Sequence, residues 1–184
     1  MYYFKASSRP KSLYWAKQQG EIFNPKTSEG DYGLGCLDIQ QDVYYKSMNG
    51  QKLLDVVGSS GGGTLFSTRL KEYIEERNLT GLEFHPVQLI LKNGEKVKYF
   101  LVRTNNECSE LDSSSAVLQK REDNPSISEY IGYTLDMKSV SDNFTRPTGT
   151  LRLLCDENTK NDLSDKFTGF IFKNISELKI IRKM

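Results

Sequence analysis

The sequence predicts an α+β fold: a mostly antiparallel sheet around a central β-hairpin at residues 87-102, with two or three helices. Two β-rich runs, Val87–Lys92 and Glu95–Val102, flank Asn93-Gly94, which is the pattern of a tight hairpin. Apolar residues recur at helical spacing between Thr68 and Arg77. The remaining β-rich runs do not alternate regularly with helices, so a doubly wound parallel sheet is not expected.

The first part of the chain predicts short strands separated by long loops. Tyr2–Phe4 is a strand candidate because aromatic side chains suit a half-buried, pleated surface. Gln18–Gly35 is rich in glycine and is expected to be mostly loop. Cys36–Ile39 and Leu53–Val57 are predicted as strands, and Asp42–Tyr45 is left unassigned.

The clearest helix is predicted over Thr68–Arg77. Either Ser67 or Thr68 can cap it by accepting a hydrogen bond from a backbone N–H group of the first turn. Asn78 and Gly81 follow as the signals that end it. The residues that fall on one face are Leu70, Tyr73, Ile74 and Arg77.

The hairpin is predicted to turn at Asn93-Gly94 through a two-residue type I′ loop, since both central positions of that turn need a positive φ. In this register Lys92 faces Glu95 as an oppositely charged pair. The strand that leads into the hairpin begins at Leu82–Phe84, and Pro86 is expected to bend or end it.

The rest of the chain predicts further short elements within a single domain, 1-184. Asn158–Lys166 is expected to form a short helix. Strands are expected at Ala116–Lys120, Tyr130–Met137, Leu151–Cys155 and Gly169–Lys173, with a last strand or irregular element at Ile175–Arg182. Loops or turns are expected at Thr104–Ser115, Arg121–Ser126 and Asn143–Gly149.

Two segments of the chain resemble each other. Leu79–Val87 and Phe167–Ile175 both read apolar-Thr-Gly-apolar-x-Phe-x-x-aliphatic, and both follow a charged, helix-like run, so the wider echo covers 65-87 and 158-175. Duplication is one explanation. The other, which we favour at this point, is that Thr-Gly is a common way to leave a helix.

The glycine-rich stretch Gly58–Thr64 raises the question of a phosphate site, because it lies between a predicted strand and a predicted helix. A Walker-type loop needs G-x-x-x-x-G-K-[ST], and Thr64 stands where the lysine must be. The dinucleotide pattern G-x-G-x-x-G does not match either. The stretch is therefore interpreted as a structural connection, and no cofactor is predicted.

Catalytic and metal chemistry find little support in the sequence. His85 is the single histidine, and nothing places a nucleophile beside it. The cysteines Cys36, Cys108 and Cys155 are odd in number and contain no C-x-x-C pair, so they are interpreted as buried reduced thiols. No D-x-D-x-D-G calcium loop is present. Adjacent acids such as Glu122-Asp123 are interpreted as solvated charges, and the protein is predicted not to be an enzyme.

Charge is balanced over the chain but unevenly placed. The net charge of +1 argues against a general nucleic-acid-binding protein. Twelve acids and six bases between Glu107 and Asp165 give this segment −6. The sequence contains no run of 18 apolar residues, so no membrane-spanning helix is predicted. No secretory signal is recognised at the N-terminus, so a cytoplasmic location is expected.

The helix and the strand that follows it resemble a known bacterial family. Leu65–Glu76 and Asn78–Val87 are similar to a pattern in immunity proteins of polymorphic toxin systems: a Ser-x-x-Leu-Lys-Glu helix, a Leu-Thr-Gly turn and a strand with Phe and often Pro. A later strand of that family resembles Tyr99–Val102, and Asp112 matches a downstream aspartate. The resemblance covers roughly a quarter of the chain.

This resemblance implies a non-catalytic protein that binds and neutralises a cognate toxin. The acidic segment could then cover a basic toxin surface, since complementary charge steers encounter. The candidate partner-binding residues are Glu107, Glu110, Asp112, Glu122 and Asp123. Two alternatives stay open: a generic interaction or scaffold module with another partner, and an enzyme of unrecognised type. The sequence does not identify the toxin or the oligomeric state.

Overall fold

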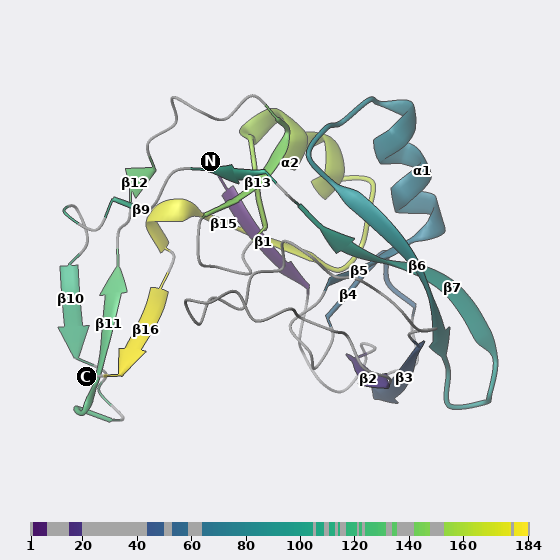
Figure 1. Cartoon of the computed structure of the whole chain (residues 1–184), viewed down its shortest axis with the longest axis horizontal. Helices are drawn as coiled ribbons and strands as arrows, with labels where there is room; N and C mark the ends of the chain where they lie inside the picture. Colours follow the sequence, from purple (N-terminus) through teal and green to yellow (C-terminus); the bar gives the residue numbers. More distant parts are fainter. Residues whose placement is uncertain are drawn as a thin grey trace, which may run out of the picture.

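The chain has the α+β fold that the sequence predicts (Figure 1). The computed structural model describes residues 2–6, 15–19, 44–49, 53–58, 64–104, 106–108, 111–112, 114, 117–120, 122, 124–131, 134–135, 142–147, 153–177 and 179–183. Within these ranges it contains two α-helices, α1 (Thr68–Glu76) and α2 (Glu157–Ser164), and a 3-10 turn, η3 (Ile175–Glu177). Strands form the rest of the regular structure.

The largest sheet has six strands in the order β2-β3-β6-β7-β5-β4. Its strands are β2 (Trp15–Gln19), β3 (Tyr44–Asn49), β4 (Val56–Gly58), β5 (Thr64–Ser67), β6 (Glu83–Ile90) and β7 (Lys96–Arg103). Strands β3 and β6 are parallel, and every other neighbouring pair is antiparallel.

The second sheet has five strands in the order β15-β1-β14-β13-β8. Its strands are β1 (Tyr2–Ala6), β8 (Glu107–Cys108), β13 (Phe144–Pro147), β14 (Leu153–Cys155) and β15 (Phe170–Asn174). The predicted strand at Tyr2–Phe4 is confirmed. It lies between β14 and β15, which are both made of residues from the last part of the chain.

Smaller sheets lie at the opposite end of the molecule from the β6–β7 hairpin (Figure 1). One has the order β10-β11-β16, and the other pairs β9 with β12. Their strands are β9 (Leu111–Asp112), β10 (Val117–Lys120), β11 (Ile127–Ile131), β12 (Thr134–Leu135) and β16 (Lys179–Lys183).

Helix α1 confirms the sequence prediction at both ends. The Ser67 side chain caps it by accepting a hydrogen bond from the Leu70 N–H group at 3.2 Å. Leu70 and Ile74 are buried, as their helical spacing predicts. The chain leaves the helix through Asn78 and Gly81, which adopt φ values of 52° and 99°.

The central hairpin is confirmed, but its predicted loop is wrong. Leu91, not Lys92, pairs with Glu95: the Leu91 N–H group donates to the Glu95 carbonyl at 2.8 Å. The loop therefore has three residues and ends at Gly94, whose φ is 84°. This register places Leu89 opposite Val97, so the apolar residues of both strands share one face; a slip by one residue would separate them.

Pro86 does not end its strand. It lies inside β6 and pairs with Phe100 of β7. Strand β3 borders β6 only from Gln88 to Ile90, so in the described structure β6 is an edge at Pro86. An edge tolerates a residue without an N–H group.

Two loop predictions are also wrong. Phe144–Pro147, expected to be a turn, forms β13, because Phe144 is fully buried and its backbone pairs with Cys155. Tertiary packing here overrides the local preference of a segment with polar residues and a proline. The expected loop Thr104–Ser115 contains strands β8 and β9, and Thr104 itself is buried.

The other elements agree with the sequence to different degrees. Strands within Ala116–Lys120, Leu151–Cys155 and Gly169–Lys173 are confirmed, as is the helix within Asn158–Lys166, which Asp156 caps. Only Val56 and Val57 of the predicted Leu53–Val57 strand belong to β4. The predicted strand Cys36–Ile39 lies outside the described residues, as does most of the loop Gln18–Gly35.

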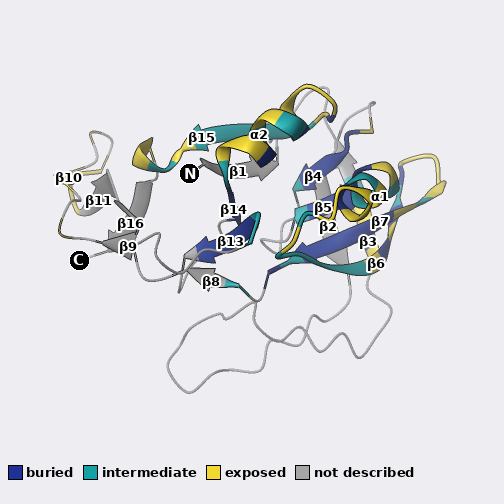
Figure 2. Ribbon diagram, turned by 90° about the horizontal axis from the view of Figure 1, so that it is seen from above, coloured by how far each residue is buried: buried dark blue, intermediate teal, exposed yellow. Residues whose placement is uncertain are grey.

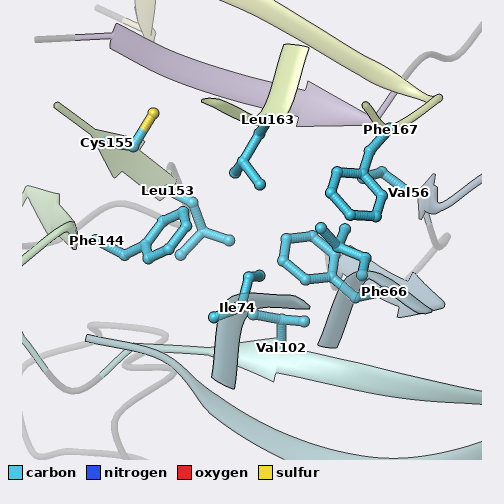
Figure 3. Close-up of a cluster of buried hydrophobic side chains, with 10 residues drawn as sticks. Val56, Phe66, Ile74, Val102, Phe144, Leu153, Cys155, Leu163 and Phe167 are labelled. Carbon is cyan, nitrogen blue, oxygen red and sulfur yellow. The ribbon is translucent and has the colours of Figure 1, made fainter. Parts of the chain in front are cut away.

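One buried cluster joins the two large sheets and both helices. Its side chains come from β4, β5, α1 and β7 on one side and from β13, β14 and α2 on the other, and they point toward one another in Figure 3. Its members are Val56, Phe66, Leu70, Ile74, Val102, Phe144, Leu153, Cys155, Leu163 and Phe167. A second cluster, which includes Tyr45, Leu65, Leu89 and Tyr99, lies within the six-stranded sheet. Exposed positions mark the outer faces of α1 and α2 (Figure 2).

Candidate functional site

The residue just before the acidic segment, Asn106, is firmly anchored by hydrogen bonds. Its carbonyl accepts hydrogen bonds from the Arg146 N–H group at 3.0 Å and from the Thr145 hydroxyl at 2.7 Å. Its side-chain amide donates to Asp142 at 2.7 Å. Arg146 is itself buried and donates through Nε to the Thr104 carbonyl. The acidic segment therefore starts from a fixed position beside β13.

The structure places the five predicted partner-binding residues at separate positions. Glu107 lies in β8 and Asp112 in β9, two short strands that belong to different sheets. Glu122 is exposed and follows β10. Glu110 and Asp123 lie outside the described residues. A role for these residues in binding stays a prediction.

Strand β10 shows a feature that the sequence reasoning missed. All four of its residues are exposed, including Val117 at 69% and Leu118 at 49%. It is an edge strand whose one neighbour in its sheet is β11. Two adjacent exposed apolar side chains on a strand edge are typical of a contact surface. The available signal was the Val-Leu pair itself, since a half-buried strand alternates apolar and polar residues.

A cluster of polar side chains between the two helices holds the carboxylate of Asp162 in its charged form. The Tyr73 hydroxyl donates to the Asp162 carboxylate at 2.8 Å, and Arg77 and Lys166 both contact these two residues. Hydrogen bonding from Lys166 lowers the pKa of Asp162 to about 2. A carboxylate held in its charged form so firmly is unsuited to proton transfer near neutral pH.

His85 is partly buried in β6, close to one acidic and one basic side chain. Burial and the nearby Arg103 lower its pKa, although Glu83 acts in the opposite direction. Its Nε2 atom lies 3.8 Å from a Glu83 carboxylate oxygen and has no hydrogen-bond partner among the described residues. The interpretation of His85 as a strand residue fits this position in β6.

The cysteine and glycine interpretations can be compared with the structure in part. Cys155 is a buried free thiol, as expected, and burial raises its pKa to about 12. Side chains of Cys36 and Cys108 are not described. Gly58 ends β4 and Thr64 begins β5, so the glycine-rich stretch connects two antiparallel strands. It does not lead directly into a helix, which corrects the strand–loop–helix expectation.

Neither a metal site nor a membrane-spanning helix is found in the described part of the chain. The described residues contain no group of three or more His, Cys, Asp or Glu side chains arranged to hold a metal ion. None of the described helices combines the length and hydrophobicity needed to span a bilayer.

Comparison with known proteins identifies the family. No curated protein matches the chain. A sequence profile of the immunity protein family Imm11 matches residues 5–177, far beyond the Leu65–Asp112 region in which the resemblance was first recognised. Because this match covers nearly the whole chain and both large sheets, the protein belongs to the immunity protein family Imm11.

Proposed function

We propose that the protein neutralises a cognate toxin by binding it, without catalysis, in the cytoplasm of the cell that produces both. The observation that carries this proposal is the match to the immunity protein family over residues 5–177. Immunity by binding needs a surface complementary to the toxin rather than a reaction centre. The firmly ionised Asp162 and the partly buried His85 are consistent with this.

The surface that best fits such a contact is the segment from Glu107 to Asp123. Val117 and Leu118 are exposed on β10 and would supply apolar contacts, one on each face of the strand, and Glu122, which follows them in the chain, would supply negative charge. A toxin with a basic surface would be attracted to this segment. The edge of β10 could also add backbone hydrogen bonds to a strand of the toxin.

Two levels of experiment test the proposal. The protein is first tagged and purified from its own host together with the products of the neighbouring genes. A toxin that co-purifies in a fixed ratio, and whose toxicity is suppressed by co-expression, supports neutralisation by binding. A stable complex with a protein that is not toxic would favour the scaffold alternative. Suppression of toxicity without a complex would favour an enzyme.

The surface is then tested with variants of the same protein. Glu122→Lys with Asp123→Lys should weaken toxin binding and slow association at low salt, because it reverses charge. Val117→Ser with Leu118→Ser should weaken binding mainly by faster dissociation. Glu76→Lys, which reverses an exposed charge on α1, is the matched control and should bind normally. If both double variants bind as tightly as the control, the contact lies elsewhere, while neutralisation itself stands.

A further inference from the structure

Two parts of the chain are built from the same elements in the same order. We call residues 55–90 the first half and residues 143–174 the second half. The first contains β4, β5, α1 and β6, and the second contains β13, β14, α2 and β15. In each, an antiparallel strand pair leads into a capped helix, and the helix leads through Thr-Gly into another strand. The sequence echo links the later part of each half, residues 65-87 and 158-175.

The helices of the two halves are buried at equivalent positions. Ser67 caps α1 and Asp156 caps α2, each by accepting a hydrogen bond from the N–H group three residues later. The buried residues are Leu70 and Ile74 in α1 and Thr159 and Leu163 in α2. In both helices these are the third and seventh residues after the cap. The two helices therefore present the same face to the shared core.

Each half binds the Thr-Gly turn of the other. The Phe144 N–H group of the second half donates to the Thr80 carbonyl at 3.1 Å, and the Val56 N–H group of the first half donates to the Thr168 carbonyl at 3.0 Å. A Cβ atom added to Gly81 would lie 2.1 Å from the Phe144 carbonyl oxygen. One added to Gly169 would lie 2.3 Å from the Val56 carbonyl oxygen.

The residue before each of these strands completes the reciprocal contact. Asp55 accepts hydrogen bonds from its own cap, Ser67, at 2.9 Å and from the Thr168 N–H group at 2.8 Å. Asn143 donates to its own cap, Asp156, at 3.3 Å and accepts from the Thr80 N–H group at 3.0 Å. We call each of these pairs a joint. The first joint is Asp55 with Ser67, and the second is Asn143 with Asp156. Each combination supplies one carboxylate.

The strands of the two halves also occupy equivalent positions in their sheets, but one strand of each sheet differs in its place along the chain. Strand β7 lies between β5 and β6 in the first half, and β1 lies between β14 and β15 in the second. Both are antiparallel to both neighbours. Strand β7 follows its half in the chain, whereas β1 precedes its half by more than a hundred residues. Position in the sheet is conserved between the halves although position in the sequence is not.

Equivalent residues also meet each other between the helices. Tyr73 and Asp162 are each the sixth residue after their cap, and they are hydrogen-bonded at 2.8 Å. Arg77 and Lys166 are each the tenth, and each contacts both Tyr73 and Asp162. Contacts between equivalent residues are the sign of a two-fold axis, as in a symmetric dimer.

From these contacts we propose that the chain is an internal pseudo-dimer. An approximate two-fold axis passes between Tyr73 and Asp162, and each half holds the Thr-Gly turn of the other. The two halves share one core cluster, to which each contributes (Figure 3). They consequently unfold together as one cooperative unit. This inference does not depend on which partner the protein binds.

Equivalence of the two joints is tested in the whole 184-residue chain by giving the first joint the residues of the second. Asp55→Asn removes the carboxylate of the first joint, and Ser67→Asp adds a second one; each should lower the urea midpoint of unfolding. Combined, they create the Asn–Asp pair that the second joint uses, and the double variant should recover at least half of the larger single loss. A double variant that loses as much as the two single variants together would overturn the equivalence.

The binding of each Thr-Gly turn by the other half is tested by hydrogen exchange, with a variant that removes a single hydroxyl group. Thr168→Val removes the hydroxyl that donates to the Asp55 carboxylate at 2.9 Å and accepts from the Asp55 N–H group at 3.3 Å; the backbone–backbone bond from Val56 to Thr168 stays in place. Faster exchange should appear in α1 and α2 alike under conditions that report global opening. Thr80→Val, at an exposed side chain in the equivalent turn, is the control and should change exchange little. Acceleration confined to α2 would mean that the halves open independently.

Discussion

The Tyr99 hydroxyl donates a hydrogen bond of 2.7 Å to the backbone carbonyl of Leu54, 45 residues earlier in the chain. Tyr99 lies in β7, and Leu54 lies just before β4. Strand β5 separates these two strands in the sheet, so the phenol spans it. Both residues are buried, and the bond fixes how the chain enters the edge strand of the six-stranded sheet.

Tyr99→Phe should lower the free energy of unfolding by about 1–3 kcal/mol, because the Leu54 carbonyl would stay buried without this donor. Urea denaturation of the purified protein measures the loss. Tyr44→Phe is the matched control, since Tyr44 is more than a third exposed, and it should change stability by no more than about 0.5 kcal/mol. Equal losses in the two variants would show that the buried hydrogen bond of Tyr99 stabilises the fold no more than the exposed hydroxyl of Tyr44 does.

Stability should fall in acid partly through Asp55. Burial alone would raise the pKa of Asp55, but hydrogen bonds from Arg69, Thr168 and Ser67 outweigh it and hold the pKa below 3.8. A carboxyl whose folded-state pKa is lowered stabilises the fold above its unfolded-state pKa. That contribution is lost as the pH falls through the folded-state value.

The measurement compares the wild type with Asp55→Asn from about pH 6 to about pH 3. The difference in unfolding free energy should be constant near pH 6 and should shrink below about pH 4. A difference that stays the same over the whole range would show that the charge of Asp55 is not what stabilises this joint.

Two glycines with positive φ should respond very differently to alanine. A Cβ added to Gly94 would meet open space, so Gly94→Ala should cost only about 1 kcal/mol of backbone strain. At Gly81 a Cβ would clash with the Phe144 backbone, so Gly81→Ala should cost clearly more, about 3 kcal/mol or above. Thermal unfolding of both variants checks the order, and similar midpoints would contradict the close approach at Gly81.

Cys155 should be unreactive in the folded protein. It is fully buried, and burial raises its pKa to about 12, so almost no thiolate is present at pH 8. In a Cys36→Ser, Cys108→Ser background, a thiol reagent should label the protein only in urea. Rapid labelling under native conditions would place Cys155 in contact with solvent.

Lys166→Met should raise the pKa of Asp162 from about 2 toward the ordinary range, because Lys166 is the largest cause of its lowering. Tyr73 and Arg77 still contact the carboxylate, so the shift should be partial. A pH titration of the Asp162 carboxyl carbon by NMR measures it. Lys160→Met, on the same helix, serves as the control and should leave the titration unchanged.

Local signals predicted those parts of the fold that local chemistry determines. Ser67 and Gly81 mark the ends of α1 because capping and positive φ depend on a few neighbouring residues. The hairpin was predictable for the same reason, but its register was not. The register depends on which face of β6 and β7 is buried, and that is decided by Tyr45 and Leu65 from other strands of the sheet.

Other features depend on partners far away in the chain. Phe144 forms a strand because Thr80 and Cys155 lie beside it, and neither is visible from a window around Pro147. The exposed pair Val117 and Leu118 is informative only once burial is known, because the same letters suit a buried strand. Candidate contact residues such as Glu122 remain predictions from charge alone.

The position of β1 sets an order of events during synthesis. A ribosome adds residues in sequence, so Tyr2–Ala6 is made long before its two neighbours, β14 and β15, the second of which ends at Asn174. All strands of the six-stranded sheet have been made once β7 is complete, whereas the five-stranded sheet must wait for β15. A translation product that stops before β14 would therefore leave β1 without either of its neighbours in the second sheet. If recognition of a partner needs that sheet, newly made protein can bind only after β15 has been made.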